Sequence, residues 1–366
     1  MQGARRALLC WGSVVLTALV SCGDYIIPGA PRPRRKSPTV EEEAGPDPIG
    51  EPTDSGAGDA EAIAWEPPPY TTAPVVGNGH AIFLHPIDRK FRRVEARLGA
   101  TPEILDTMLD RISPGEDTKM GMSRDGNWLV IETSRFGCGE DSCVGVMAGD
   151  LSRGERVTVR GVPLGVGAST LAIGGEGRLI VYGTGAGQHT SDLFSIVKTA
   201  RGWSDPRNLT ASSPFDANHR PNLSPDSRRA VFDCGPDPTG AEGTAICEVA
   251  VDGTGFRVLR RPAGLKNLHN PAYSQDGTIV IEHEDREEKI WRMDADGVAY
   301  SPINPEFGND NTPCVLPNGN ILSLFLRRPG NQNGDHELKM MTSKGQIIGY
   351  LQIQLDIVDI GNPCGN

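Results

Sequence analysis

The chain has 366 residues, a formal net charge of −11 at pH 7, 37% hydrophobic residues and only 5% aromatic residues. The acidic balance argues against a nucleic-acid partner, because phosphate binding needs a basic surface. With so few aromatic residues, a core of this chain has to be built mainly from Val, Ile, Leu and Ala.

The first 22 residues are typical of a targeting signal. Arg5 and Arg6 precede a short apolar run from Ala7 to Val20. This run is shorter than the roughly 20 residues that a membrane-spanning helix needs. The end of the run, Leu19-Val20-Ser21-Cys22, resembles a bacterial lipobox, in which the cysteine carries the lipid. We expect a lipid anchor at Cys22. A plain secretory signal, cleaved after a small residue, is the alternative.

Residues 23–71 predict a disordered tether. The segment is rich in Pro, Glu, Asp and Gly, and the triplet Pro67-Pro68-Pro69 lies near its end. Such a composition cannot bury enough apolar surface to offset the conformational entropy that is lost on ordering. The predicted folded domain is therefore 72–366.

A strand–turn–strand pattern recurs along this domain. Its clearest copy runs from Asn222 to Phe232, where Ser224-Pro225-Asp226-Ser227 favours a tight turn between two apolar runs. With the last turn residue as marker, the copies lie at residues 79, 126, 177, 227, 277 and 319, at intervals of 47, 51, 50, 50 and 42 residues. Periods of about 40–50 residues with several strands each predict a β-propeller. Six markers predict an all-β ring of six four-stranded blades.

One stretch departs from the β pattern. Thr101-Pro102-Glu103 has the cap and early proline of a helix start. Apolar residues at helical spacing follow, namely Ile104, Leu105, Met108, Leu109 and Ile112. The sequence predicts a short helical insertion here, in the first blade.

The repeat resembles that of TolB-type propellers. The likeness rests on the turn between two strands, followed by an aromatic-containing strand and a second turn, as in Ile290 to Met293 before Asp294 to Gly297. Arg201 to Thr210, followed by Arg220 to Ser224, is similar to the outer and next inner strands of such repeats. The resemblance covers about 72–366 and implies a six-bladed propeller. TolB proteins bind a peptidoglycan-associated lipoprotein, but this chain has a tether where they have a globular domain.

Cysteine positions favour an exported protein. Six cysteines remain once Cys10 in the signal and Cys22 are set aside. By position we expect three disulfides, Cys138–Cys143, Cys234–Cys247 and Cys314–Cys364. An even number fits an oxidising compartment. A zinc site, the alternative, would need the tight Cys-x-x-Cys spacing that is missing.

Three polar residues occupy equivalent repeat positions. His219, His269 and Asn311 each stand two residues before a proline. Equivalent positions of a propeller lie at equal radius and height, so these side chains should meet at one mouth of the central channel and form a candidate ligand site. The two histidines could also hold a divalent metal with Asp216 or Asp310. Alternatively, these residues only cap the strand entries by bonding exposed backbone.

Two functions from different classes follow. The chain has no G-x-S-x-G nucleophile motif and no H-E-x-x-H zinc motif. The first reading is therefore a non-enzymatic scaffold, lipid-anchored in the bacterial envelope, periplasmic or surface-exposed, that binds an envelope protein. The second is a channel-mouth site for a small molecule or glycan, lytic or hydrolytic, that uses His219 and His269. No cofactor is expected beyond the optional divalent metal.

Overall fold

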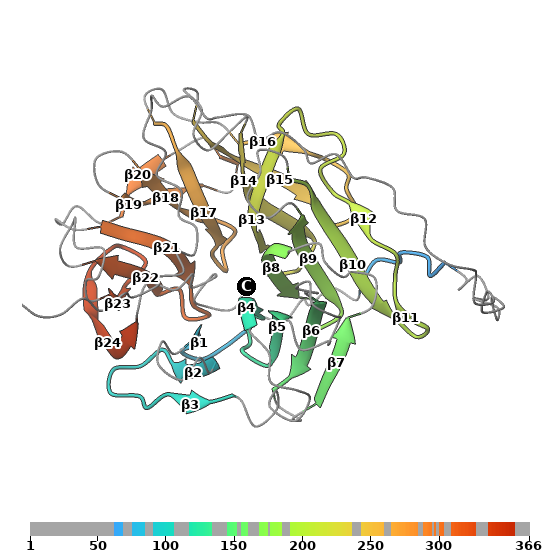
Figure 1. The fold of residues 1–366 in the computed structure, drawn as a ribbon. Helices are drawn as coiled ribbons and strands as arrows, with labels where there is room; N and C mark the ends of the chain where they lie inside the picture. The colour runs from blue at the N-terminus through green and yellow to red at the C-terminus, as the bar shows by residue number, and fades with distance from the viewer. Residues whose placement is uncertain are drawn as a thin grey trace, which may run out of the picture. The chain divides into compact units, whose positions relative to one another are not determined.

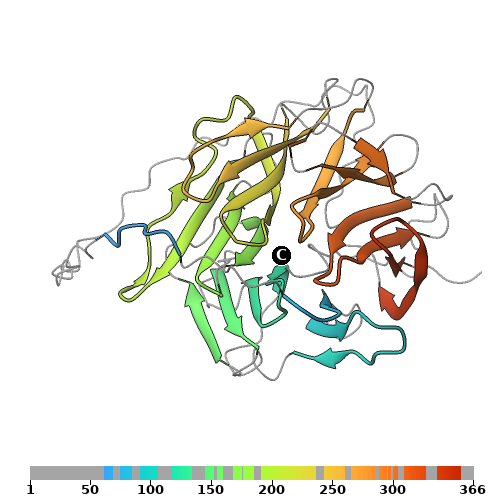
Figure 2. The ribbon, with the colours of Figure 1, turned by 180° about the vertical axis from the view of Figure 1, so that it is seen from behind.

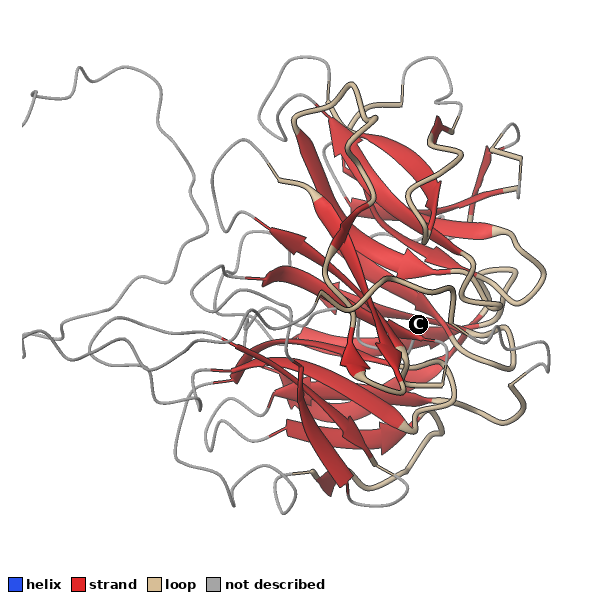
Figure 3. Cartoon of the chain, turned by 90° about the vertical axis from the view of Figure 1, so that its right-hand side faces the viewer, coloured by secondary structure: helices blue, strands red, loops and turns tan. Residues whose placement is uncertain are grey.

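The computed structural model describes residues 62–68, 75–84, 91–105, 117–133, 145–151, 155–159, 168–174, 176–184, 191–235, 243–259, 265–284, 288–294, 296–297, 300–303, 309–326 and 336–355. The predicted signal, Cys22 and the predicted tether up to residue 61 lie outside these ranges. Every regular element in the described ranges is a strand (Figure 3). No helix long and apolar enough to cross a membrane occurs in this part of the chain.

Six antiparallel sheets follow one another around a ring (Figures 1 and 2). Blade one contains β1 (His80–Leu84), β2 (Phe91–Glu95) and β3 (Glu103–Ile104). Blade two contains β4 (Asp117–Met122), β5 (Trp128–Thr133), β6 (Gly145–Asp150) and β7 (Glu155–Val159). Blade three contains β8 (Ala168–Gly174), β9 (Leu179–Thr184) and β10 (Leu193–Thr199), with β11 (Gly202–Trp203) and β12 (Arg207–Asn208) both paired to β10.

The second half of the ring is more regular. Blade four contains β13 (Ala217–Leu223), β14 (Arg229–Gly235), β15 (Ala245–Ala250) and β16 (Arg257–Val258). Blade five contains β17 (Leu268–Tyr273), β18 (Ile279–Glu284), β19 (Glu288–Met293) and β20 (Tyr300–Pro302). Blade six contains β21 (Asn309–Val315), β22 (Ile321–Leu326), β23 (His336–Met341) and β24 (Ile347–Leu355). The predicted six-bladed β-propeller is confirmed.

The six marker residues share one backbone conformation. Their φ angles lie between 57° and 83°, at Gly79, Gly126, Gly177, Ser227, Gly277 and Gly319. This left-handed region is free of strain for glycine but not for serine. The turn at Ser227 is closed by its own amide, which donates to the Ser224 carbonyl at 2.8 Å. The turn therefore separates the first strand from the second in blades two to six, and in blade one it directly precedes β1.

Apolar packing between blades closes the ring. One core cluster combines Phe83 of blade one, Met120 of blade two and Leu322 of blade six, all buried. Gly79, in the marker turn of blade one, also faces Pro317, in the marker turn of blade six, with too little space between them for a Cβ on Gly79. Blade one is thus held between blades six and two by side-chain packing.

The predicted helix is wrong at its start. Glu103 and Ile104 form β3, which pairs with β2 through Arg93 and Arg92. The exposed edge of β2 offers unpaired backbone groups, and a strand satisfies them where a helix would not. Ile104 is 51% exposed, so this apolar residue of the predicted helical face is not buried in a core. Residues 106–112 lie outside the described ranges.

Residues 62–68, inside the predicted tether, lie on the propeller as an N-terminal strap. Trp65 Nε1 donates to Ser195 Oγ at 3.1 Å, and that hydroxyl donates to the Val251 carbonyl of blade four at 2.9 Å. The Arg207 guanidinium stacks 4.5 Å from the centre of the Trp65 ring. The strap, blue in Figures 1 and 2, lies beside the outer strands of blade three. Its anchor is the junction of blades three and four.

Candidate functional site

The inner strands of blades four, five and six carry the same β-bulge. The register shifts directly after His219, His269 and Asn311. The residue that follows each of them is left-handed, with φ of 51° at Arg220, 48° at Asn270 and 47° at Thr312. A bulge adds one residue to a strand and re-aims the neighbouring side chains. Non-glycine residues seldom adopt this conformation, so its threefold repetition marks a built feature.

The bulges gather a set of polar residues near the axis of the ring. We call this set the axial cluster: His219, Arg220, Asp233, His269, Asn270, Glu282, Glu284, Glu288, Asn311 and Thr312. The inner strands β13, β17 and β21 supply most members, and β14, β18 and β19 supply the carboxylates. The three predicted residues therefore lie at the same place, directly before the bulge, in the inner strands β13, β17 and β21. Figure 1 shows these three strands as neighbours around the ring.

Asp233 links blades four and five within the cluster. Its Oδ2 accepts a hydrogen bond from Arg220 Nη1 at 2.9 Å and lies 3.5 Å from His269 Nδ1. The side chain is only 2% exposed. Burial works to raise the pKa of Asp233, but Arg220 and then His269 outweigh it and hold the pKa below its usual value. Asp233 therefore stays charged between two cations.

His269 is the charged histidine of the pair. It is buried, and its Nε2 lies 3.5 Å from Glu284 Oε2. Burial alone would lower the pKa of His269, but hydrogen bonds with Asp233 and Glu284 outweigh burial and raise it to about 9. The imidazole is therefore protonated at neutral pH.

Two further carboxylates connect blades five and six. Glu282 Oε2 accepts from Asn270 Nδ2 and from the Thr312 amide, both at 2.8 Å. Glu288 Oε2 accepts from Asn311 Nδ2 at 3.0 Å. Burial, and next the charge of Glu282, raise the pKa of Glu288 to about 7. One carboxyl group of the cluster can thus exchange a proton near neutral pH.

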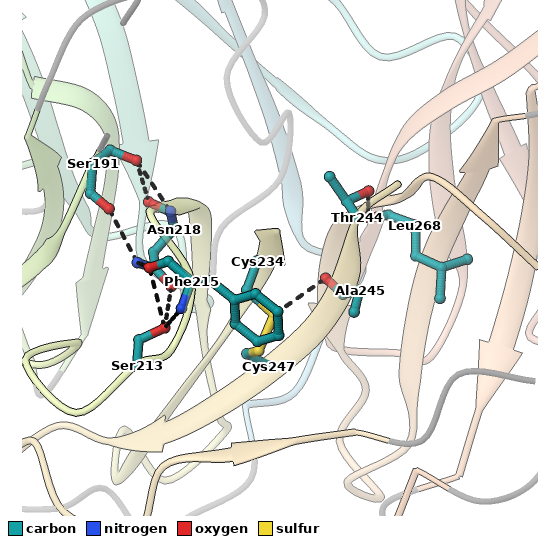
Figure 4. Close-up of a disulfide and its surroundings, with 9 residues drawn as sticks. All are labelled: Ser191, Ser213, Phe215, Asn218, Cys234, Thr244, Ala245, Cys247 and Leu268. Atoms are coloured by element: carbon teal, nitrogen blue, oxygen red, sulfur yellow. Dashed lines mark hydrogen bonds between the residues drawn. A yellow bond between two sulfur atoms is a disulfide. The ribbon is translucent and has the colours of Figure 1, made fainter. Parts of the chain in front are cut away.

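His219 has a neutral hydroxyl as its hydrogen-bond partner. Its Nδ1 is 3.0 Å from Ser191 Oγ, and burial is the main cause that lowers its pKa. The same hydroxyl donates to the Asn218 carbonyl, and the Asn218 side chain bonds in turn to Ser213 and Phe215 (Figure 4). His219 thus lies where the loop before β10 is fixed to the start of β13.

The two aspartates considered as metal ligands take other places. Asp310 is fully buried within blade six, where its Oδ2 lies 2.5 Å from Lys339 Nζ and its Oδ1 accepts from Ser323 Oγ at 2.7 Å. Asp216 is exposed before β13, and its carbonyl accepts from the Ser191 amide at 2.8 Å. Within the described ranges, no group of three His, Cys, Asp or Glu side chains is placed to hold a metal ion.

One predicted disulfide is confirmed beside the cluster. Cys234, next to Asp233 in β14, is bonded to Cys247 in β15, with their Cα atoms 5.9 Å apart (Figure 4). Cys314 is also disulfide-bonded. The other three cysteines of the prediction, Cys138, Cys143 and Cys364, lie outside the described residues.

The sequence analysis missed the charged residues of the cluster. Arg220 stands directly between His219 and the following proline, so its position was visible in the repeat. The carboxylates of β14 and β18 do not lie next to a repeated proline, so the repeat does not reveal them. They meet the histidines only through strand pairing, as in Asp233 opposite His219 and Glu282 opposite His269.

Raising the pH should weaken the fold through His269. Its pKa is raised from 6.5 to about 9, so its stabilising contribution is complete below pH 6.5 and is lost as the pH rises through 9. Thermal melting between pH 7.5 and 10 should show the midpoint falling. A His269→Gln variant should melt lower at pH 7.5 and lose most of the pH dependence. A variant that follows the parent curve would show that the ion pairs do not hold the proton.

Similar proteins were found by structure alone. No protein-family profile and no curated protein matches the sequence. TolB of Acinetobacter baumannii is 15% identical, with a TM-score of 0.56 over 77% of this chain and 66% of that chain. Puromycin hydrolase is 14% identical, with a TM-score of 0.51 over 80% and 46% of the two chains. A puromycin-hydrolyzing peptidase of Mycobacterium tuberculosis is 11% identical, with a TM-score of 0.50 over 75% and 42%.

These matches concern the fold. The chain spans just under two thirds of the TolB chain and less than half of the two peptidase chains. The resemblance of the repeat to TolB-type propellers is confirmed at this level, since a TolB structure is among the neighbours. The chain is therefore a six-bladed β-propeller of the kind found in TolB.

Proposed function

We propose that this protein is a non-enzymatic interaction scaffold of the bacterial envelope, tethered to a membrane through a lipid on Cys22. The observation that supports this function is the pairing inside the axial cluster. His219 and His269 both bond to neighbouring blades, and so do Asp233 and Glu282. Side chains that are hydrogen-bonded between blades fix the blades relative to one another, and so keep the surface above them in one shape for a partner. The likeness to TolB, a propeller by fold, supports the same reading.

The surface that we assign to an envelope protein is the open edge of the cluster. Glu284 lies there with 48% of its side chain exposed, at the end of β18. A half-exposed carboxylate beside buried ion pairs is well suited to orient a partner that carries positive charge. The net charge of −11 fits a partner with a basic contact surface.

Site-specific crosslinking in the native host tests this proposal. A photoreactive residue at Glu284 should give one discrete protein adduct. The same residue at Arg228, whose side chain is 58% exposed in the turn of blade four, serves as the matched control. No adduct from position 284, or equal adducts from both positions, would refute a partner at the cluster.

A small-molecule or glycan site is the second candidate, and Glu288 favours it. A carboxyl group with a pKa of about 7 can act as a general acid or base. If this second function is correct, a Glu288→Gln variant should fold normally and lose turnover of a glycan or peptide substrate. The scaffold reading expects the variant to keep its crosslinked partner.

Replacement of the proposed anchor should release the protein. A Cys22→Ser variant lacks the thiol that would carry the lipid, so the mature chain should move from the membrane fraction to the soluble fraction of lysed cells. Metabolic labelling with a radioactive fatty acid should mark the parent and leave the variant unlabelled. Labelling of both proteins, or retention of the variant on membranes, would contradict the lipid anchor.

A further inference from the structure

The turn of blade two sends one side chain across the axis of the ring. Arg124 follows β4 in the first turn of its blade, and its Nη2 donates to the Tyr273 carbonyl at 2.8 Å. Tyr273 ends β17, the inner strand of blade five. Blades two and five stand opposite each other in a ring of six. The Arg124 guanidinium therefore lies on the axis, at the end of the inner strands that is remote from the axial cluster.

This guanidinium is buried without a counter-charge. Arg124 is 7% exposed, and its Nε and Nη1 have no hydrogen-bond acceptor. Its one polar contact in the described part of the chain is the neutral Tyr273 carbonyl. The turn that it reaches carries a similar group, because the Nε2 of Gln275 is also buried and has no acceptor. Arg124 and Gln275 occupy the same place in their turns, Ser-Arg-Asp-Gly and Ser-Gln-Asp-Gly.

A lone buried cation needs compensation. Removal of an ion from water costs free energy even after relaxation of the protein. Burial lowers the pKa of Arg124 only to about 10, so the group stays charged at neutral pH. Two other buried cations in the described residues, Lys339 and His269, have carboxylates nearby: Asp310 lies 2.5 Å from Lys339 Nζ, and Asp233 and Glu284 each lie 3.5 Å from the His269 ring. Arg124 differs from both, because no carboxylate of the described ranges is paired with it.

We propose that a small oxyanion, a carboxylate or a phosphate, binds on the axis at this end of the ring, with Arg124 as its counter-charge. Its oxygens would accept from Nε and Nη1, since charge-assisted hydrogen bonds to carboxylate or phosphate are the strongest that a guanidinium makes. The site is separate from the axial cluster and does not depend on the proposed scaffold role.

Thermal melting of the full chain, purified without oxyanions in a chloride buffer, tests the proposal. Inorganic phosphate and acetate are titrated separately at constant ionic strength. A bound anion should raise the melting midpoint by about 5 °C at a hundredfold excess over its Kd, and above Kd the rise should follow the logarithm of the anion concentration. The anion that produces this rise at the lower concentration identifies the preferred chemistry. A shift that is linear in concentration up to the highest concentration used, or no shift with either salt, overturns the site.

Two variants locate the effect. Arg124→Met should abolish the logarithmic rise of the melting midpoint with anion concentration. Arg178→Met, which removes an exposed arginine beside the equivalent turn of blade three, should keep it. Equal shifts in both variants would also overturn the proposal. If Arg124→Met does not fold, equilibrium dialysis of the unaltered protein with radioactive phosphate or acetate decides, with one bound anion per chain expected and none refuting the site.

Discussion

An Asp310→Asn variant should lose about 3–5 kcal/mol of unfolding free energy, because it leaves the Lys339 ammonium buried without its counter-ion. The two side chains are 0% and 1% exposed, and Asp310 Oδ2 lies 2.5 Å from Lys339 Nζ. The Phe325 ring, 4.3 Å from the ammonium, cannot replace a full negative charge. Urea denaturation followed by circular dichroism measures the loss.

Two controls separate the buried pair from general effects of charge. Arg97→Gln removes the exposed Arg97–Glu95 pair, whose side chains are 59% and 40% exposed, and should leave the urea midpoint nearly unchanged. The double variant Asp310→Leu/Lys339→Met removes both buried charges and should recover much of the loss. An Asp310→Asn variant as stable as the parent would mean that the ammonium finds water or another partner.

The second large effect is expected from the disulfide of blade four. Cys234–Cys247 closes a loop of 13 residues, for which loss of the crosslink should cost about 3 kcal/mol. A Cys234→Ala/Cys247→Ala double variant avoids the reduction of other disulfides and should unfold at a correspondingly lower urea concentration. Equal midpoints for variant and parent would show that the crosslink restrains neither state.

The six-bladed ring could be predicted because the turns between its strands depend on local sequence. A turn of Ser, Pro, Asp and Gly works through the dihedral angles of its own residues, and each marker indeed adopts the left-handed region. The spacing of the markers then sets the number of blades. The disulfide Cys234–Cys247 followed from the same local reading, since both cysteines fall in neighbouring strands of one blade.

The partners of the axial cluster could not be predicted, because the bulge changes the register. Regular pairing from Tyr273 and Ile279 would place His269 opposite His283. The bulge after His269 places it opposite Glu282 instead. A one-residue shift exchanges the two faces of a strand, so polar contacts beyond the bulge follow from the three-dimensional pairing.

Composition also misjudged two short segments. The strap belongs to a predicted tether that is rich in Pro, Glu, Asp and Gly, yet its residue Trp65 contributes both an aromatic surface and a donor that matches Ser195. Glu103, at the start of the predicted helix, instead forms part of β3, which pairs with the edge of β2. In both cases a pairing within the fold outweighed the local preference, with Ser195 for Trp65 and with strand β2 for Glu103.

The strap has a mechanical consequence. In a tethered protein, a pulling force from the N-terminal side enters the ring at residues 62–68, before it reaches blade one. The load then passes through Trp65 into the junction of blades three and four. That junction lies across the ring from the seam where blade six meets blade one. A pulling force of this kind would act on a continuous part of the ring and would leave the seam between blades six and one unloaded.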